Sequence, residues 1–176
     1  MNAKQKLVET LFDLLTIKSF DDITVSELCR VSKVHRTTFY LYFDNLFELL
    51  EEGKEEAMRK IASYYPERKT NVDNYMTMEY LVPYLHFIRD NKSLFLAYFT
   101  HGDLLNVKEQ YEKGVLNSIS IPRSKGTDSK TIDYISSFYI GGIVSIILKW
   151  INAGFVETPE EIADVILRAI RSGKNL

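Results

Sequence analysis

The residues best suited to chemistry in this chain lie between Cys29 and Phe43. This segment contains three cations, Arg30, Lys33 and Arg36, and neither aspartate nor glutamate. Its other polar groups include those of His35, Thr37, Thr38, Tyr40 and Tyr42. Guanidinium, ammonium and hydroxyl groups bind phosphate oxygens and base edges. Because the whole chain of 176 residues has a net charge of -2, this local cationic segment favours a site-specific DNA binder over a protein that coats nucleic acid.

Two short helices joined by a tight turn would position these side chains. Thr24 and Glu27 have the spacing of a capping box, in which each side chain accepts a hydrogen bond from the backbone N–H of the other residue. The apolar residues after Thr24 share one helix face as far as Cys29. The polar pair Ser32-Lys33 interrupts this face, and Val34 begins a second apolar pattern. This arrangement predicts a helix-turn-helix, whose second helix lies in the DNA major groove.

The same segment resembles the DNA-binding domain of TetR-family transcriptional regulators. The matching residues are Thr24-Val25, Leu28-Cys29, Ser32-Lys33-Val34-His35, Thr37-Thr38-Phe39-Tyr40 and Phe43. The resemblance implies an all-α fold, with an N-terminal three-helix helix-turn-helix domain over residues 1–45 and a C-terminal helical dimerisation and effector domain over residues 46–176. With the charge pattern, it indicates DNA contacts from Thr24, Lys33, His35, Arg36, Thr37, Thr38, Tyr40 and Tyr42.

Three departures from the family pattern affect this interpretation. Lys33 replaces a turn glycine, so a residue with a side chain must adopt a left-handed conformation at some cost. Thr37 stands where a small residue is usual, and Leu46 replaces a lysine that usually contacts a phosphate. Lys33 and Leu46 favour a second hypothesis, a homodimeric helical ligand-binding or interaction protein without DNA-binding activity. An ordinary bundle of three helices is the plainest alternative.

Apolar periodicity predicts helices along the rest of the chain, with no strands and no repeats. We expect helices over residues 3–18, 45–65, 74–90, 93–101, 104–117 and 129–153, and a last helix from Pro159 that Thr158 and Glu161 cap. Pro83 should kink or divide the helix that contains it. Pro66 and the polar residues after it mark a domain boundary, and residues 121–128 form a loop.

The segment over residues 135–151 is apolar on all sides, so it must be covered on all sides. Small residues recur in it at every fourth position, where another helix could approach closely. A central helix of a monomeric bundle is the alternative, and the segment is too short and polar for a confident membrane span. We therefore expect a homodimer, as the resemblance also implies, with an interface that includes Ser137, Gly141, Ser145, Ile162 and Ile166.

No catalytic or metal-binding pattern occurs in the sequence. His35, His86 and His101 are far apart, and we expect His86 to be a core residue with its polar groups satisfied. A cluster of four glutamates near Glu52 fits a solvated helix face better than a cation site. We expect no enzyme, cofactor or metal. The single cysteine, Cys29, fits a small core residue in a reducing cytoplasm.

We also expect an effector, and a helix that transmits its binding to the DNA-binding domain as a lever. The middle of the chain is rich in tyrosine and phenylalanine, which suit a ligand cavity and a helical core equally well. The resemblance implies a palindromic operator in double-stranded DNA, more often repression than activation, and a small-molecule or protein effector. The helix over residues 45–65 would link the two domains, with Gly53 as its weak point.

Overall fold

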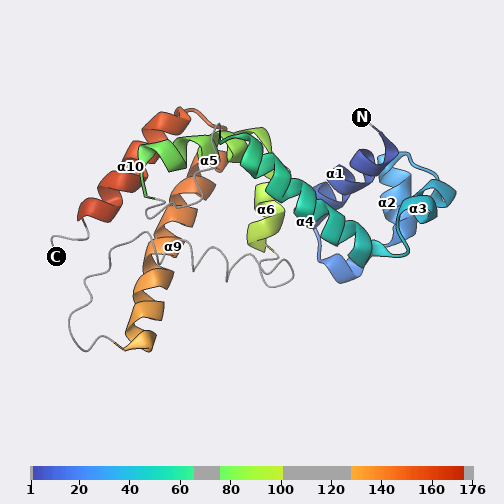
Figure 1. Cartoon of the computed structure of the whole chain (residues 1–176), viewed down its shortest axis with the longest axis horizontal. Coiled ribbons are helices and arrows are strands. Elements are labelled where there is room, and N and C mark those ends of the chain that lie inside the picture. Colours follow the sequence, from blue (N-terminus) through green and yellow to red (C-terminus); the bar gives the residue numbers. More distant parts are fainter. Residues whose placement is uncertain (1, 66–75, 101–127, 173–176) are drawn as a thin grey trace. The chain divides into compact units, whose positions relative to one another are not determined.

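In the described part of the chain, every regular element is a helix. The computed structural model describes residues 2–65, 76–100 and 128–172, and its regular elements are shown in Figure 1. These residues form two compact units: one contains α1 to α4 and α6, and the other contains α5, α9 and α10. The prediction of an all-α fold is confirmed. The expected helix over residues 104–117, the loop over 121–127, the boundary at 66–71 and His101 lie outside the described residues.

Helix α1, Ala3–Leu15, is the centre of the first unit and contacts α2, α3, α4 and α6. A capping box starts it, because the side chain of Asn2 accepts from the backbone of Gln5 and the side chain of Gln5 accepts from the backbone of Asn2. Its inner face contains Leu7, Leu11 and Leu15, which are fully buried. The helix ends three residues earlier than we expected, and a 3-10 turn, η1, follows at Phe20–Asp22.

Helix α4, Leu46–Ser63, crosses α1 closely at Gly53. The Asn45 side chain caps its first turn by accepting from the N–H of Glu48 at 3.0 Å. A Cβ atom at Gly53 would lie 2.4 Å from Cε2 of Phe12, whose side chain is buried. The role of Gly53 as the weak point of a lever stays a prediction. The structure adds a packing role, because an alanine here would force the Phe12 ring to move.

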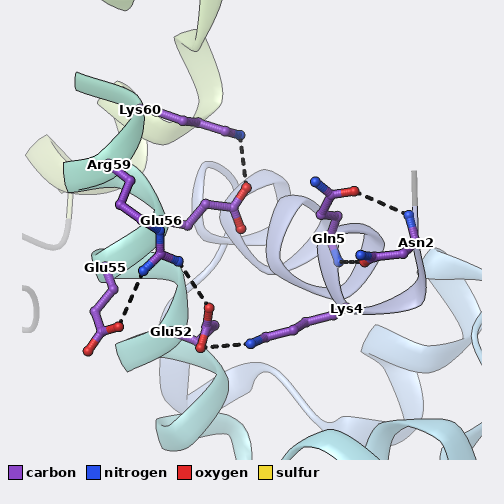
Figure 2. A network of polar contacts seen from close by, with 8 residues as sticks. All are labelled: Asn2, Lys4, Gln5, Glu52, Glu55, Glu56, Arg59 and Lys60. Carbon is purple, nitrogen blue, oxygen red and sulfur yellow. Dashed lines mark hydrogen bonds and ion pairs between the residues drawn. The ribbon is translucent and has the colours of Figure 1, made fainter. Parts of the chain in front are cut away.

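One ion pair connects α1 with α4, and further ion pairs lie along α4 itself (Figure 2). Nζ of Lys4 lies 2.9 Å from a carboxylate oxygen of Glu52, and Arg59 contacts the other oxygen at 3.2 Å. The same Arg59 pairs with Glu55, and Lys60 pairs with Glu56. The contacts with Lys4 and Arg59 hold the pKa of the Glu52 carboxyl below its ordinary value, with the hydrogen bond from Lys4 as the largest cause. The glutamate cluster is therefore a solvated, ion-paired face, as expected, and no metal-binding group was found among the described residues.

Helix α6, Lys92–Thr100, completes the first unit by packing on α1. It begins at Lys92, so Ser93, which the sequence predicted as the N-cap, lies inside the helix. The side chain of Phe95 is almost fully buried. The first unit therefore includes α4 and α6 in addition to the three N-terminal helices, because all five helices pack together. A functional boundary at residue 45 stays a prediction.

In the second unit, α5, Met78–Asp90, packs on α10, Pro159–Ser172. Helix α5 runs through Pro83 without a break, so the proline does not divide it. The capping box predicted at the start of α10 is confirmed, since Thr158 and Glu161 exchange backbone-to-side-chain hydrogen bonds of 2.8 and 3.2 Å.

Helix α9, Ser129–Asn152, contacts α10 near the turn between them. Its side chains at Ile143, Ile147, Trp150 and Ile151 are buried. Gly154 and Phe155 both have positive φ in the turn, and the Phe155 ring packs edge-on against Trp150 at 4.9 Å. The indole N–H of Trp150 donates to the carbonyl of Glu157 at 2.8 Å, which fixes the path into α10.

Candidate DNA-binding surface

Helix α2, Val25–Ser32, is the first helix of the predicted helix-turn-helix. The Thr24 hydroxyl caps it by accepting from the N–H of Glu27 at 3.1 Å. The reciprocal half of the predicted capping box does not form. Instead, the Glu27 carboxylate accepts from Nζ of Lys18 at 2.8 and 3.0 Å, because the end of α1 brings an ammonium group within reach. An ion pair between Lys18, in the turn after α1, and Glu27 on α2 thus replaces the local hydrogen bond.

Lys33 forms the turn between the two helices, in the left-handed conformation that the sequence predicted. Its φ is 56° and its ψ is 34°. The backbone N–H of Lys33 and that of Val34 both donate to the carbonyl of Cys29, which closes the end of α2. Glycine adopts this conformation freely, whereas other residues do so at a cost of about 1–2 kcal/mol. The prediction of a strained non-glycine turn is confirmed.

Helix α3, Arg36–Tyr42, buries one face and exposes the other. The Phe39 ring is fully buried and the Phe43 ring after the helix is nearly so. Thr37 is exposed, Thr38 is half-buried, and Tyr40 and Tyr42 are 51 % and 48 % exposed. Two aromatic anchors therefore hold α3 on the unit, next to α2 (Figure 1), while its polar side chains remain available to a ligand.

The three cations of the segment surround this face. Arg30, Lys33 and Arg36 are exposed, and within the described residues none of them belongs to an ion pair. They line an open hollow of about 420 Å³ together with Ser26, Cys29, Val34 and His35. In contrast, the cations on α4 are paired with glutamates. The free charge of the first unit's cationic segment is thus available for an anionic partner.

Cys29 lies under the hollow as a core residue. Its side chain is 5 % exposed. Burial raises the pKa of the Cys29 thiol, and the positive charge of Arg36 opposes that change in part. A raised pKa leaves little reactive thiolate at neutral pH. This agrees with the expected role of a small core residue.

The structure brings most of the expected DNA contacts onto one surface. Lys33, His35 and Arg36 line the hollow, and the hydroxyl residues follow on α3. His35 is the N-cap residue of α3 but makes no capping hydrogen bond with its side chain, so its ring remains available. Thr24 stands apart, at the N-cap of α2. Leu46, at the position of the missing lysine, is half-buried as the first residue of α4.

Sequence reasoning missed two residues of this surface. Arg30 was counted among the cations but was not named as a contact, although it lines the hollow. Leu41 was passed over, although its side chain is 80 % exposed on α3. Its position two residues after the buried Phe39 is the signal that could have found it, because residues two apart point to nearly opposite sides of a helix.

A second surface concerns the expected dimer. On α9 the small residues Ser137, Gly141 and Ser145 are exposed along one stripe, next to Tyr134 and Phe138, which are 77 % and 75 % exposed. The stretch Asp133–Asn152 has a mean hydropathy of 1.5 and the length to cross a membrane, with 24 % of it buried. One such helix is weak evidence for a membrane span, and an interface between protein chains would cover the same residues.

The side chains expected from α10 are not part of that surface. Ile162 is 6 % exposed and Ile166 is fully buried, because α10 turns this face toward the inside of its own unit. The exposed apolar residues of α10 are Val165, which is 44 % exposed, and Ala169. This corrects the expected interface at Ile162 and Ile166. The helical period predicted for the apolar residues of α10 was correct, but these residues face the core of their own unit and not a second protomer.

His86 is half-buried rather than a core residue. Its Nε2 lies 3.4 Å from a carboxylate oxygen of Glu160, and its Nδ1 lies 3.0 Å from a guanidinium nitrogen of Arg89. The ring therefore connects α5 with the first turn of α10, which corrects the expected burial. Its polar atoms have partners, as we expected.

Known proteins resemble the chain over most of its length. A TetR-type family model described as "Transcriptional regulator C-terminal region" matches residues 76–172, more than half of the chain. The HTH-type transcriptional regulator YxbF of Bacillus subtilis (strain 168) is 21 % identical over 169 residues, which are 94 % of this chain and 44 % of that protein. The chain thus spans less than half the length of this curated relative.

Solved structures show the same fold. A TetR-family transcriptional regulator from Streptomyces coelicolor is 16 % identical with a TM-score of 0.60, and the match covers 97 % of this chain and 79 % of the other. A transcriptional regulator from Aquifex aeolicus VF5 has a TM-score of 0.56 at 16 % identity, with 99 % and 98 % covered. The dihydroxyacetone kinase operon activator DhaS has a TM-score of 0.51 at 19 % identity, with 97 % and 95 % covered. The family model shows that the chain belongs to the TetR family of transcriptional regulators, and the all-α fold shared with these structures agrees with it.

Proposed function

We propose that this protein binds a palindromic operator in double-stranded DNA as a homodimer, with α3 of each protomer in the major groove. The observation that supports this most is the free positive charge beside α3. Arg30, Lys33 and Arg36 are exposed without ion pairs in the described part of the chain, whereas the cations of α4 are neutralised by glutamates. A surface with unpaired cations is suited to a polyanion such as DNA.

The individual contacts divide into two classes. Arg36 and Thr37 open α3, where side chains of a helix-turn-helix reach base edges, and the proposed role of Arg36 is to bind a guanine. The second class would bind phosphates and fix the register of the helix. It consists of Lys33, His35, Thr38, Tyr40 and Tyr42, together with Thr24 at the start of α2. The first class determines which sequence is bound, and the second determines mainly how tightly any DNA is held.

Dimerisation would use the exposed stripe of α9 with Ser137, Gly141 and Ser145. In a dimer on a palindrome, two recognition helices must enter successive major grooves about 34–36 Å apart. An effector that binds one spacing better than another would then change DNA affinity. We propose such a small-molecule or protein effector for the part of the chain after residue 45, with α4 as the lever.

We propose repression, in which the bound dimer blocks access to a promoter in the cytoplasm. DhaS is described as an operon activator. The experiment must therefore distinguish repression from activation. A reporter gene behind the bound DNA should lose expression when the protein is produced and recover it in the Arg36→Ala variant. Increased expression would make the protein an activator.

A second function is favoured by Leu46, which provides no ammonium group at the start of α4. In this case the chain would be a homodimeric helical interaction or ligand-binding protein without DNA-binding activity. The strained turn at Lys33 does not add support, because α2 and α3 form on both sides of it.

Selection from a random-sequence DNA library distinguishes the two functions. The wild-type protein should enrich a palindrome, and gel shifts should show the same preference among fragments that flank its own gene. Lysine and arginine contacts to phosphates predict a steep loss of affinity with salt. A protein that enriches no sequence and binds random duplexes no better than the Arg30, Lys33 and Arg36 triple alanine variant would contradict the DNA-binding function.

A further inference from the structure

Among the described residues of the first unit, Leu41 is the most exposed large apolar residue. Its side chain is 80 % exposed, compared with 51 % for Tyr40 and 48 % for Tyr42 on either side. Single exposed leucines are common on protein surfaces and need no explanation by themselves. Leu41 differs because of its place, on the helix that we propose as the DNA reader.

The geometry of α3 places Leu41 on the side of that helix that faces away from the first unit. Residues of an α-helix follow one another at about 100°. Thr37 and Leu41, each two residues from the buried Phe39, therefore point about 160° away from it. They are the side chains most nearly opposite to the surface on which α3 rests, so they would enter a groove most deeply.

The surroundings of Leu41 identify the partner as DNA. Arg36 and Lys33 lie on or just before the same helix, are exposed, and have no ion pair in the described residues. A protein partner would need complementary acidic groups as well as an apolar contact, whereas the DNA major groove offers both phosphates and one apolar base feature. That feature is the C5-methyl group of thymine.

We propose that Leu41 reads a thymine, by packing its side chain against the C5-methyl group in the major groove. The inference rests on the proposed DNA-binding function and adds one specificity-determining residue to it. Leucine has no donor or acceptor, so it cannot read any other base edge by hydrogen bonding. The selected operator should accordingly contain a thymine in each half-site whose methyl group, and not its hydrogen-bonding groups, contributes to affinity.

The test uses the duplex that the wild-type protein selects from a random library. Each thymine is replaced in turn by deoxyuridine, which removes the methyl group and leaves every hydrogen-bonding group in place. Burial of one methyl or methylene group is worth about 0.8 kcal/mol, which corresponds to about fourfold in affinity. We expect the wild type to lose about fourfold at one thymine of each half-site, and Leu41→Ala to bind the thymine and deoxyuridine duplexes equally.

Two variants serve as controls. Leu41→Met retains an apolar side chain and should retain most of the dependence on the methyl group. Ile17→Ala removes another exposed apolar side chain, 75 % exposed and outside α3, and should keep the full dependence. Since Leu41 makes little contact with its own unit, the thermal midpoint of Leu41→Ala should match that of the wild type.

The outcomes separate this inference from the proposed function. If the wild type enriches a palindrome but tolerates deoxyuridine at every thymine, Leu41 does not read a methyl group, while DNA binding stands. Equal methyl dependence in the wild type and in Leu41→Ala would likewise overturn the assignment to this residue. If no sequence is enriched at all, the proposed function fails and takes this inference with it.

Discussion

Lys33 shows that one residue can have opposite effects on stability and on binding. Its left-handed backbone costs free energy in the folded protein, yet its side chain is exposed beside α3 with no carboxylate partner in the described residues. Strain of this kind persists when the surrounding structure fixes it, and it is frequent at functional sites. A phosphate contact by the ammonium group is the function that we infer for it.

Lys33→Gly should therefore stabilise the protein and weaken its binding to DNA. Glycine relieves the left-handed strain, which stabilises the folded protein, but its larger backbone entropy in the unfolded state offsets part of this gain. The free energy of unfolding should therefore rise by about 0.5–1 kcal/mol. Loss of one phosphate contact should lower the slope of log affinity against log salt by about 1. Lys33→Ala keeps the strain and loses the charge, so it should show the binding effect alone. An unchanged salt slope in both variants would exclude a phosphate contact.

Arg36 should affect which DNA sequence is bound. Loss of a bidentate contact to guanine in Arg36→Ala should cost about 1–3 kcal/mol on the selected duplex and relax the preference at one position of each half-site. Tyr40→Phe should instead weaken binding to selected and random duplexes by similar factors, because phosphates are the same in every sequence. Fluorescence anisotropy titrations with both duplexes measure this. A similar loss on both duplexes for Arg36→Ala would mean that it contacts the backbone.

At the scale of the elements, the crossing of α1 and α4 controls the geometry of the first unit. Gly53 allows the two helices to touch, since a Cβ atom there would lie within 3.0 Å of two Phe12 ring atoms. The Lys4–Glu52 ion pair joins the same two helices on their outer side (Figure 2). A substitution at this crossing acts on the position of α4 through packing rather than through helix propensity.

Gly53→Ala should accordingly be destabilising, although alanine favours a helix by about 1 kcal/mol over glycine. Overpacking typically costs about 1–3 kcal/mol, so we expect a net loss of about 1 kcal/mol in urea unfolding. Shortening the ring by Phe12→Leu should make room for the methyl group. The double variant should therefore lose less unfolding free energy than the sum of the losses in the two single variants. Simple additivity, or a stabilised Gly53→Ala, would show that the ring moves away without cost.

At the scale of the whole molecule, the exposed stripe of α9 is the surface that a second protomer would cover. Tyr134, Phe138 and Gly141 lie on it. Among the described residues, a Cβ atom at Gly141 or Gly142 would meet nothing within 4 Å apart from its chain neighbours and its own helix backbone. These two glycines are therefore suitable positions at which to test association.

Gly141→Leu should weaken the dimer, because a bulky side chain on the stripe prevents close approach of a second helix. Gly142→Leu changes helix propensity by the same amount but lies about 100° around the helix, so it should weaken the dimer less. Light scattering at micromolar concentration should give a dimer mass for the wild type and a lower average mass for Gly141→Leu. A monomer mass for the wild type would remove dimerisation from the proposal.

The sequence by itself determined the features that depend on neighbours along the chain. The periods of the apolar residues predicted the helices, and the Thr158–Glu161 capping box formed as expected. The resemblance to the TetR family placed a left-handed turn at Lys33, and the structure has it there. These features need only short-range hydrogen bonds and backbone sterics, which the order of residues fixes directly.

The tertiary structure decided the features that depend on residues far apart in the sequence. Glu27 binds Lys18 rather than closing its own capping box, because the turn after α1 brings Lys18 next to α2. Gly53 is a contact point because Phe12 is opposite, and Ile166 faces inward because α5 packs on α10. Periodicity shows that a helix has an apolar side and leaves open what covers it. Only the packing of distant segments assigns each apolar or charged group to the core, to another residue or to solvent.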